Sequence, residues 1–175
     1  MTSWVVCKAL PQKGNVGFRR WSQRRHLRAL VFAIALTASG CMMAPVRPEM
    51  PHLGADLSLR STSPNEVKVV FVNISNSLTH GLDSSGRINI WLDGKAVGGP
   101  DIAEYLQVQI PKGNHQLILE HLDMAKWRSA HDIFLQTDPT IIAIRATTTS
   151  NEIEFRREMP SPGALGPYRP HVFGP

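Results

Sequence analysis

The central part of the chain alternates between hydrophobic and polar residues with a period of two, and turn residues interrupt the pattern every eight to twelve positions. This pattern predicts β-strands that bury one face. Only residues 122–130 show helical spacing, and that stretch is short. The expected strands cover residues 67–74, 87–92, 95–97, 105–110, 115–122, 133–136, 141–147 and 152–157.

Two turn signals and one apolar run refine this picture. Asp93-Gly94 lies between apolar runs and predicts a type I′ hairpin, whose two central residues need positive φ. Pro111-Lys112-Gly113-Asn114 predicts a second hairpin, joining residues 105–110 to residues 115–122. Residues 67–74 are nearly continuously apolar, which predicts a central strand. Because each sheet must bury a face, the sequence predicts an all-β fold, a small β-sandwich of about seven strands.

Proline-rich segments flank the strands. Residues 42–54 contain three prolines, and residues 159–175 contain five prolines and three glycines. The first segment predicts a solvated tether that spans some 40 Å at roughly 3.1 Å per residue. The second predicts a disordered tail, in which Tyr168 and Phe173 offer docking groups for a partner.

The N-terminal region has the organisation of a signal peptide. A basic segment, residues 19–28, precedes ten apolar residues, 29–38, and then Ser39, Gly40 and Cys41. We expect a helical signal peptide here. The ten apolar residues are too few for a membrane span, which needs about 20, but they suit the apolar part of a signal peptide. The expected domains are a signal peptide at 1–40, a lipidated cysteine and tether at 41–55, the β-sandwich at 56–158 and the tail at 159–175.

Residues 36–41 (LTASGC) resemble the bacterial lipobox, with Ala38 where leucine is most common. The resemblance implies cleavage between Gly40 and Cys41, lipid attachment to Cys41, and anchoring without a membrane span. Met42, rather than aspartate, implies sorting to the outer membrane. The alternatives are ordinary signal-peptidase cleavage after Gly40, an uncleaved anchor, or a misassigned start. Residues 24–27 (RRHL) resemble a twin-arginine signal, but Arg28 favours the general secretion route.

The basic charge belongs to the leader. Of the 175 residues, the first 40 hold seven of the 19 lysines and arginines and none of the 14 acidic residues. The rest of the chain is therefore slightly acidic, and a nucleic-acid partner is not expected. Without the leader only one cysteine remains, which excludes a disulfide within the mature chain.

Residues 91–98 (WLDGKAVG), 105–110 (YLQVQI) and 111–115 (PKGNH) together resemble the PEGA-like domains of bacterial lipoproteins of unknown function. The similarity covers about residues 66–147. It implies an immunoglobulin-like or prealbumin-like β-sandwich in the cell envelope, with no established catalytic activity. The tyrosine pair that often opens the strand at Thr140-Ile141-Ile142 is missing, so no role of that pair carries over.

Candidate metal ligands are scattered. Six histidines follow the leader, and His115 and His121 share a strand face but lie about 20 Å apart. His80 and His131 could meet, but no cysteine or carboxylate cluster accompanies them. We expect no metal and no cofactor, and we interpret His115 as closing the turn that precedes it.

The loop of residues 76–86 contains His80 and Asp83, with serines at positions 75, 77, 84 and 85 inside or beside it. It has no nucleophile elbow, and these residue types are ordinary in a solvent loop, so we expect no catalytic residues. The loop is either a binding surface or a tolerated insertion. A glycosidase would need two acids on facing strands, whereas Glu152 and Glu154 share one strand. We interpret Trp91 and Trp127 as core or rim residues.

These observations favour a non-enzymatic lipoprotein at the periplasmic face of the outer membrane, with the sandwich as an envelope accessory or interaction module. Its expected partners are the membrane, through the lipid, and an envelope protein or the cell wall. One alternative is a protein-binding subunit of a secretion or export assembly that uses edge-strand addition. Another is a periplasmic enzyme or inhibitor.

Overall fold

The computed structural model describes residues 43–57, 61, 63–76, 86–123, 125–161 and 166–173. Within these ranges the chain forms nine strands and no helix, so no described helix could cross a membrane. The all-β prediction is confirmed, and the number of strands is higher than the about seven expected. The strands are β1 (Glu66–Asn73), β2 (Ile88–Leu92), β3 (Lys95–Gly98), β4 (Glu104–Pro111), β5 (Gly113–Leu122), β6 (Lys126–Leu135), β7 (Thr140–Ala146), β8 (Asn151–Arg156) and β9 (Arg169–Pro170).

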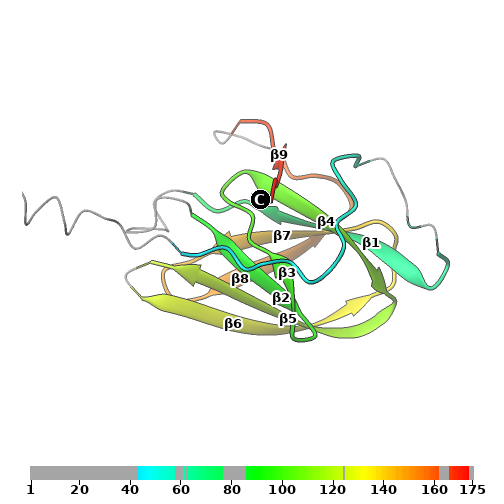
Figure 1. Cartoon of the computed structure of the whole chain (residues 1–175), viewed down its shortest axis with the longest axis horizontal. Helices are drawn as coiled ribbons and strands as arrows, with labels where there is room; N and C mark the ends of the chain where they lie inside the picture. The colour runs from blue at the N-terminus through cyan, green and yellow to red at the C-terminus, as the bar shows by residue number, and fades with distance from the viewer. Residues whose placement is uncertain are drawn as a thin grey trace, which may run out of the picture. The chain divides into compact units, whose positions relative to one another are not determined.

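The strands form two sheets that pack face to face (Figure 1). The first sheet has the order β8-β7-β1-β4-β9 and the second has the order β3-β2-β5-β6. Pairing is antiparallel except between β1 and β7 and between β4 and β9. The predicted β-sandwich is therefore present, and β1 is the central strand of its sheet, as predicted.

The core follows from the alternation of each strand. Inward residues of both sheets form one buried cluster, which includes Val69 and Phe71 of β1, Val108 of β4 and Leu119 of β5. A second, smaller cluster on the outer face of the first sheet includes Val70, with Met159 and Tyr168 packed against it. Strand β1 is thus buried on both faces, which explains why its sequence is almost continuously apolar.

The two predicted hairpins have different outcomes. The Asp93-Gly94 hairpin is confirmed: β2 pairs with β3, and the two turn residues have φ of 51° and 79°. The second hairpin is wrong, because β4 pairs with β1 in one sheet and β5 pairs with β2 and β6 in the other. The turn at residues 111–113 therefore carries the chain between the sheets. Residues 122–130 do not form a helix but contribute to β5 and β6.

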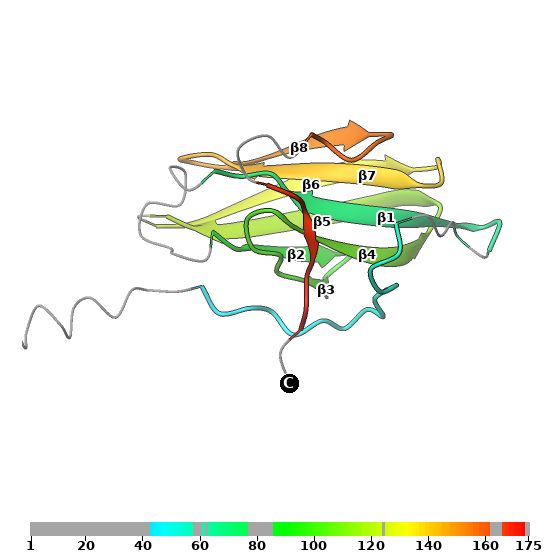
Figure 2. The same ribbon diagram turned by 90° about the horizontal axis from the view of Figure 1, so that it is seen from above.

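The predicted solvated tether is wrong for its described residues. Residues 43–57, which we call the strap, lie along the side of the sandwich that holds β3 and β4 (Figure 2). The amide of Glu49 donates to the carbonyl of Ala96 in β3 at 2.8 Å, and the amide of Leu53 donates to the carbonyl of Gln107 in β4 at 3.0 Å. Prolines prevent the strap from forming a regular strand, but these two amides still pair with β3 and β4.

The strap is held at both ends by buried side chains. Near its start, the Asn89 amide donates to the Ala44 carbonyl at 3.0 Å. At its other end, the ammonium of Lys68 donates to the carbonyls of Asp56 and Leu57 at 3.1 and 2.8 Å. Burial lowers the pKa of Lys68, while the charges of Asp56 and Asp138 oppose this shift.

The predicted disordered tail is also wrong for its described residues. Arg169 and Pro170 form β9 on the edge of β4, and the amides of Arg169 and His171 donate to the carbonyls of Ala103 and Tyr105. The strap continues this cover, since His52 bridges to Val108 further along β4. Segments from opposite ends of the domain thus cap one strand edge in succession, which protects it from pairing with another chain.

The sandwich therefore has two unlike sides. The side formed by β3, β4 and β9 is covered by the strap, and we call it the closed side. The opposite side is formed by β6 and β8, each of which has a strand partner on one edge only among the described residues. We call it the open side.

Candidate functional site

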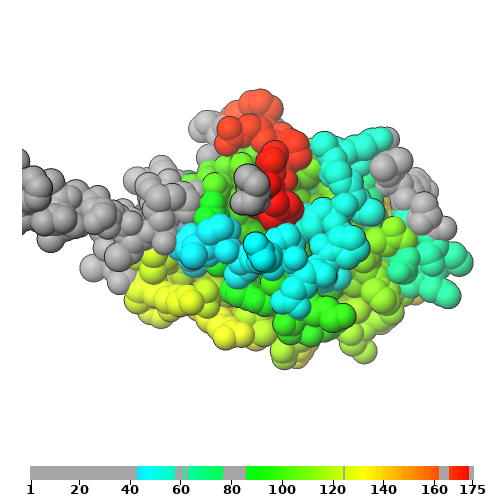
Figure 3. Space-filling model, in the orientation of Figure 1, coloured from blue at the N-terminus to red at the C-terminus, as the bar shows by residue number. Residues whose placement is uncertain are grey.

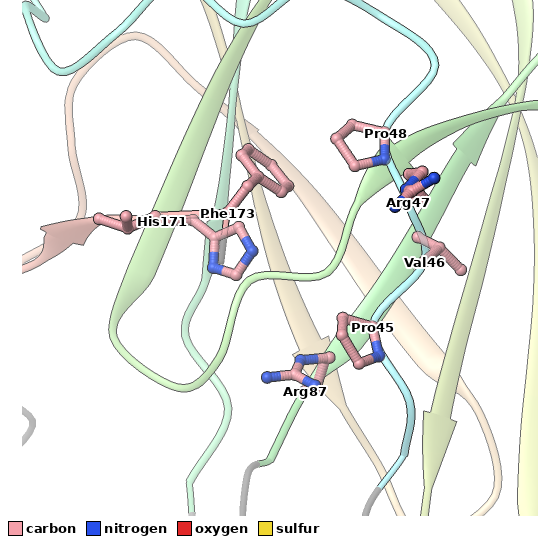
Figure 4. Close-up of a pocket in the computed structure, with 8 residues that line it drawn as sticks. Pro45, Val46, Arg47, Pro48, Arg87, His171 and Phe173 are labelled. Carbon is pink, nitrogen blue, oxygen red and sulfur yellow. The ribbon is translucent and has the colours of Figure 1, made fainter. Parts of the chain in front are cut away.

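The candidate site is a pocket on the closed side, where the strap passes the C-terminal residues. These two segments lie side by side on this face (Figure 3). The pocket has a volume of about 250 Å³, with residues 45–48 of the strap on one side and His171 and Phe173 on the other (Figure 4). We call it the strap pocket. A second hollow of about 420 Å³ lies between the C-terminal residues and residues 105–107 of β4.

Phe173 is the centre of the contact between the two terminal segments. Its ring makes edge-to-face contacts with His52 at 4.2 Å and with His171 at 4.6 Å between ring centroids. Gly98 provides room for the ring, because a Cβ there would lie 3.1 Å from Phe173 and 2.9 Å from Leu106. Gly98 also has a φ of +148°, so glycine is favoured at this position on two grounds.

Charged groups connect the start of the strap to β9. Arg87 donates from Nη1 to the Met43 carbonyl at 3.1 Å, and its Nε lies 2.9 Å from Asp101 Oδ1. The Asp101 amide donates to Glu104 Oε2 at 3.0 Å, and that same oxygen accepts a 2.7 Å hydrogen bond from His171 Nδ1. This continuous network couples the position of one terminal segment to that of the other.

Burial has opposite effects on two groups of this site. It raises the pKa of Asp101, although the Arg87 guanidinium opposes the shift. It lowers the pKa of His52, whose Nε2 donates to the Val97 carbonyl at 2.7 Å. That hydrogen bond partly offsets the effect of burial on the His52 pKa, and neighbouring His171 lowers it further. Burial therefore favours the neutral form of His52, which packs as an aromatic ring against Phe173.

The open side carries a different surface. Phe134 of β6 is 60% exposed and Phe155 of β8 is 49% exposed. Together with Arg156 and Arg157 they line a pocket of about 300 Å³. Exposed phenyl rings beside free strand edges are typical of surfaces that bind other proteins.

Several predicted site residues lie outside the described ranges. They are the lipid-attachment residue Cys41, the cleavage position Gly40, and His80, Asp83 and the serines at 77, 84 and 85 of the loop. Ser75 is described, and it is a structural residue: its buried hydroxyl accepts a 2.8 Å hydrogen bond from the Ala146 amide. The lipidation site remains a prediction.

His115 and His121 do not converge on a common site. His115 Nε2 lies 2.9 Å from the Pro111 carbonyl, which confirms its role in closing that turn, and its Nδ1 lies 2.7 Å from Asp93 Oδ2. His121 is buried and bonded to Asn151, so His115 and His121 have separate surroundings. Across the described ranges, no three His, Cys, Asp or Glu side chains are grouped as a metal site would need.

One set of polar side chains has the residue types of a hydrolase. His131 Nε2 and Asn151 Nδ2 each lie 3.1 Å from Ser129 Oγ. The Asn151 amide also reaches the Leu119 carbonyl at 3.3 Å, and its oxygen bonds to His121. Asn151 thus links β8 to β5 and β6, so the set serves as a partly buried cross-link between the sheets.

The site residues His52, His171 and Phe173 lay in segments predicted to be solvated or disordered. The sequence contained one signal for this site, namely aromatic side chains within proline-rich segments, because such side chains favour a surface that covers them. It does not indicate which surface. Comparisons of this chain with protein-family models, with curated proteins and with solved structures found no match.

Proposed function

We propose that this chain is a non-enzymatic lipoprotein, anchored through Cys41 to the periplasmic face of the outer membrane, whose sandwich binds another envelope component. The observation that carries the proposal is the difference between the two sides. The closed side is covered by the strap, which begins two residues after Cys41. The open side offers exposed phenyl rings and two strand edges that no other described strand covers.

The anchor is tested by comparing the wild-type chain with Cys41→Ser in Gram-negative cells. We expect wild-type protein in the outer-membrane fraction, beginning at residue 41 and carrying the mass of the acyl chains. The variant should lack that mass and leave the membrane fraction, because the Cys41 thiol is the attachment point. Ser39→Ala, which keeps a small residue before the cysteine, serves as the control and should behave as wild type. An unmodified wild-type protein would contradict the anchor.

A more specific form of this function is strand addition at β6, as in a subunit of a secretion or export assembly. The observation that favours it is the length of β6, which has ten residues and pairs only with β5 among the described strands. Its exposed alternate residues suit recognition, while the backbone supplies hydrogen bonds to an added strand.

Photocrosslinking in cells tests strand addition. A photoreactive residue in place of Ala130, which is exposed on β6, should form adducts with one envelope protein. The same residue in place of Thr148, which is exposed in the turn between β7 and β8, should not. Equal labelling from both positions would show that β6 is not the binding edge.

A further inference from the structure

The strap is bonded to the sandwich from its first residues, which lie close in the chain to the proposed lipid. Met43 is buried, and its carbonyl accepts the 3.1 Å hydrogen bond from Arg87. The Asn89 side chain then binds both the Ala44 carbonyl and, at 3.3 Å, the Val46 amide. The chain is therefore fixed to the sandwich from Met43 onward, only two residues after Cys41.

This short connection limits the distance between sandwich and bilayer. An extended chain spans at most about 3.6 Å per residue, so Met43 lies within about 7 Å of Cys41. The headgroup layer on each side of a bilayer is about 5–8 Å thick. If acyl chains on Cys41 insert into the hydrocarbon, Met43 must lie in or directly above the headgroups. The sandwich to which Met43 is bonded is then not held some 40 Å from the lipid, as a solvated tether would hold it.

The surface beside Met43 has the chemistry of a membrane-facing surface. It contains the strap pocket, which no acidic side chain lines; of its two arginines, Arg87 forms an ion pair with Asp101, so Arg47 supplies the basic group for lipid. Arg47 is exposed. Val172, on the opposite wall, is 79% exposed although it is apolar. Basic and apolar groups side by side suit the boundary between anionic headgroups and acyl chains.

We infer that the strap-pocket face of the closed side lies against the bilayer, with Val172 at the interface and Arg47 beside lipid phosphates. The inference rests on the proposed lipidation of Cys41. It places the open side, which is opposite, toward the periplasm, where β6 and β8 are accessible to a partner.

The test uses the acylated mature product, which begins at residue 41 and so lacks Cys7, in vesicles of phosphatidylethanolamine and phosphatidylglycerol that carry a quencher on the headgroup. A fluorophore is attached to a single cysteine introduced by Val172→Cys or, as the control, by Phe134→Cys on the open side. Both parent residues are exposed, so neither change disturbs the core. The acylated N-terminal residue offers no competing thiol. We expect at least twofold stronger quenching at position 172 than at position 134.

A second variant tests the short connection itself. Ten Gly and Ser residues inserted between Met42 and Met43 should lower the quenching at position 172 by at least half. Equal quenching at the two positions in an acylated protein, or quenching at position 172 that the insertion leaves unchanged, would overturn the inference and leave the anchor standing. Mass spectrometry that finds no acyl chains would overturn the inference and the proposed function together.

Discussion

Replacement of Phe71 by alanine is expected to lower the free energy of unfolding by about 3–5 kcal/mol, because a buried phenyl ring leaves a cavity that the surroundings fill only in part. Phe71 is fully buried in β1, the central strand of its sheet. Its nearest neighbours across the strands are Leu106 of β4 and Ile142 of β7. Urea unfolding, followed by tryptophan fluorescence, measures the loss.

Phe134→Ala is the matched control for this substitution. It removes the same ring from a position that is 60% exposed. Surface substitutions usually change the free energy of unfolding by no more than about 0.5 kcal/mol. Similar losses for the two variants would contradict the assignment of β1 to the centre of the core.

Asn73→Ala is expected to lower the free energy of unfolding by about 3 kcal/mol or more. The Asn73 amide donates to the carbonyls of Gly86 and Pro100 at 2.9 and 3.0 Å, and its oxygen accepts from the Ser75 amide at 3.0 Å. Asn73 is fully buried. Alanine would remove this partner from three backbone groups. The Pro100 carbonyl keeps the amide of Ile88 at 3.3 Å, so the Gly86 carbonyl and the Ser75 amide carry the loss, and each unsatisfied buried group costs about 1–3 kcal/mol.

The control for Asn73 is Asn65→Ala. Asn65 is exposed, and its carbonyl, which accepts from the Lys112 amide, stays in place after the substitution. Urea titration should therefore give a change within about 0.5 kcal/mol. A loss at Asn73 no larger than this would mean that the side chain does not hold the ends of β1, β2 and β3 together.

The sequence predicted those features that depend on local chemistry. Alternation located the strands, and the Asp93-Gly94 pair identified a turn that requires positive φ at both residues. The turn at residues 111–113 shows the limit of this reasoning. Its proline and glycine predict a reversal of the chain, but they do not determine whether the next strand stays in the same sheet.

The strap and β9 could not be predicted for a different reason. Proline content indicates that a segment cannot build its own regular structure, yet it leaves open whether the segment docks on an existing edge. Docking here depends on partners far away in the sequence, such as Asn89 for Val46 and Gly98 for Phe173. The candidate site was missed because its residues come together only when both terminal segments bind the completed sandwich.

The capping of β4 from both directions also sets the order in which the domain is completed. The strap precedes β4 in the chain, whereas β9 follows the other described strands, so the strap becomes available first in synthesis and in export. Until residues 166–173 emerge, Glu104 and Tyr105 lack the neighbours that they have in the finished fold. A chain truncated before Tyr168 would keep that part of β4 bare and open to pairing with a second molecule. By covering this edge, β9 therefore protects the domain from aggregation through β4.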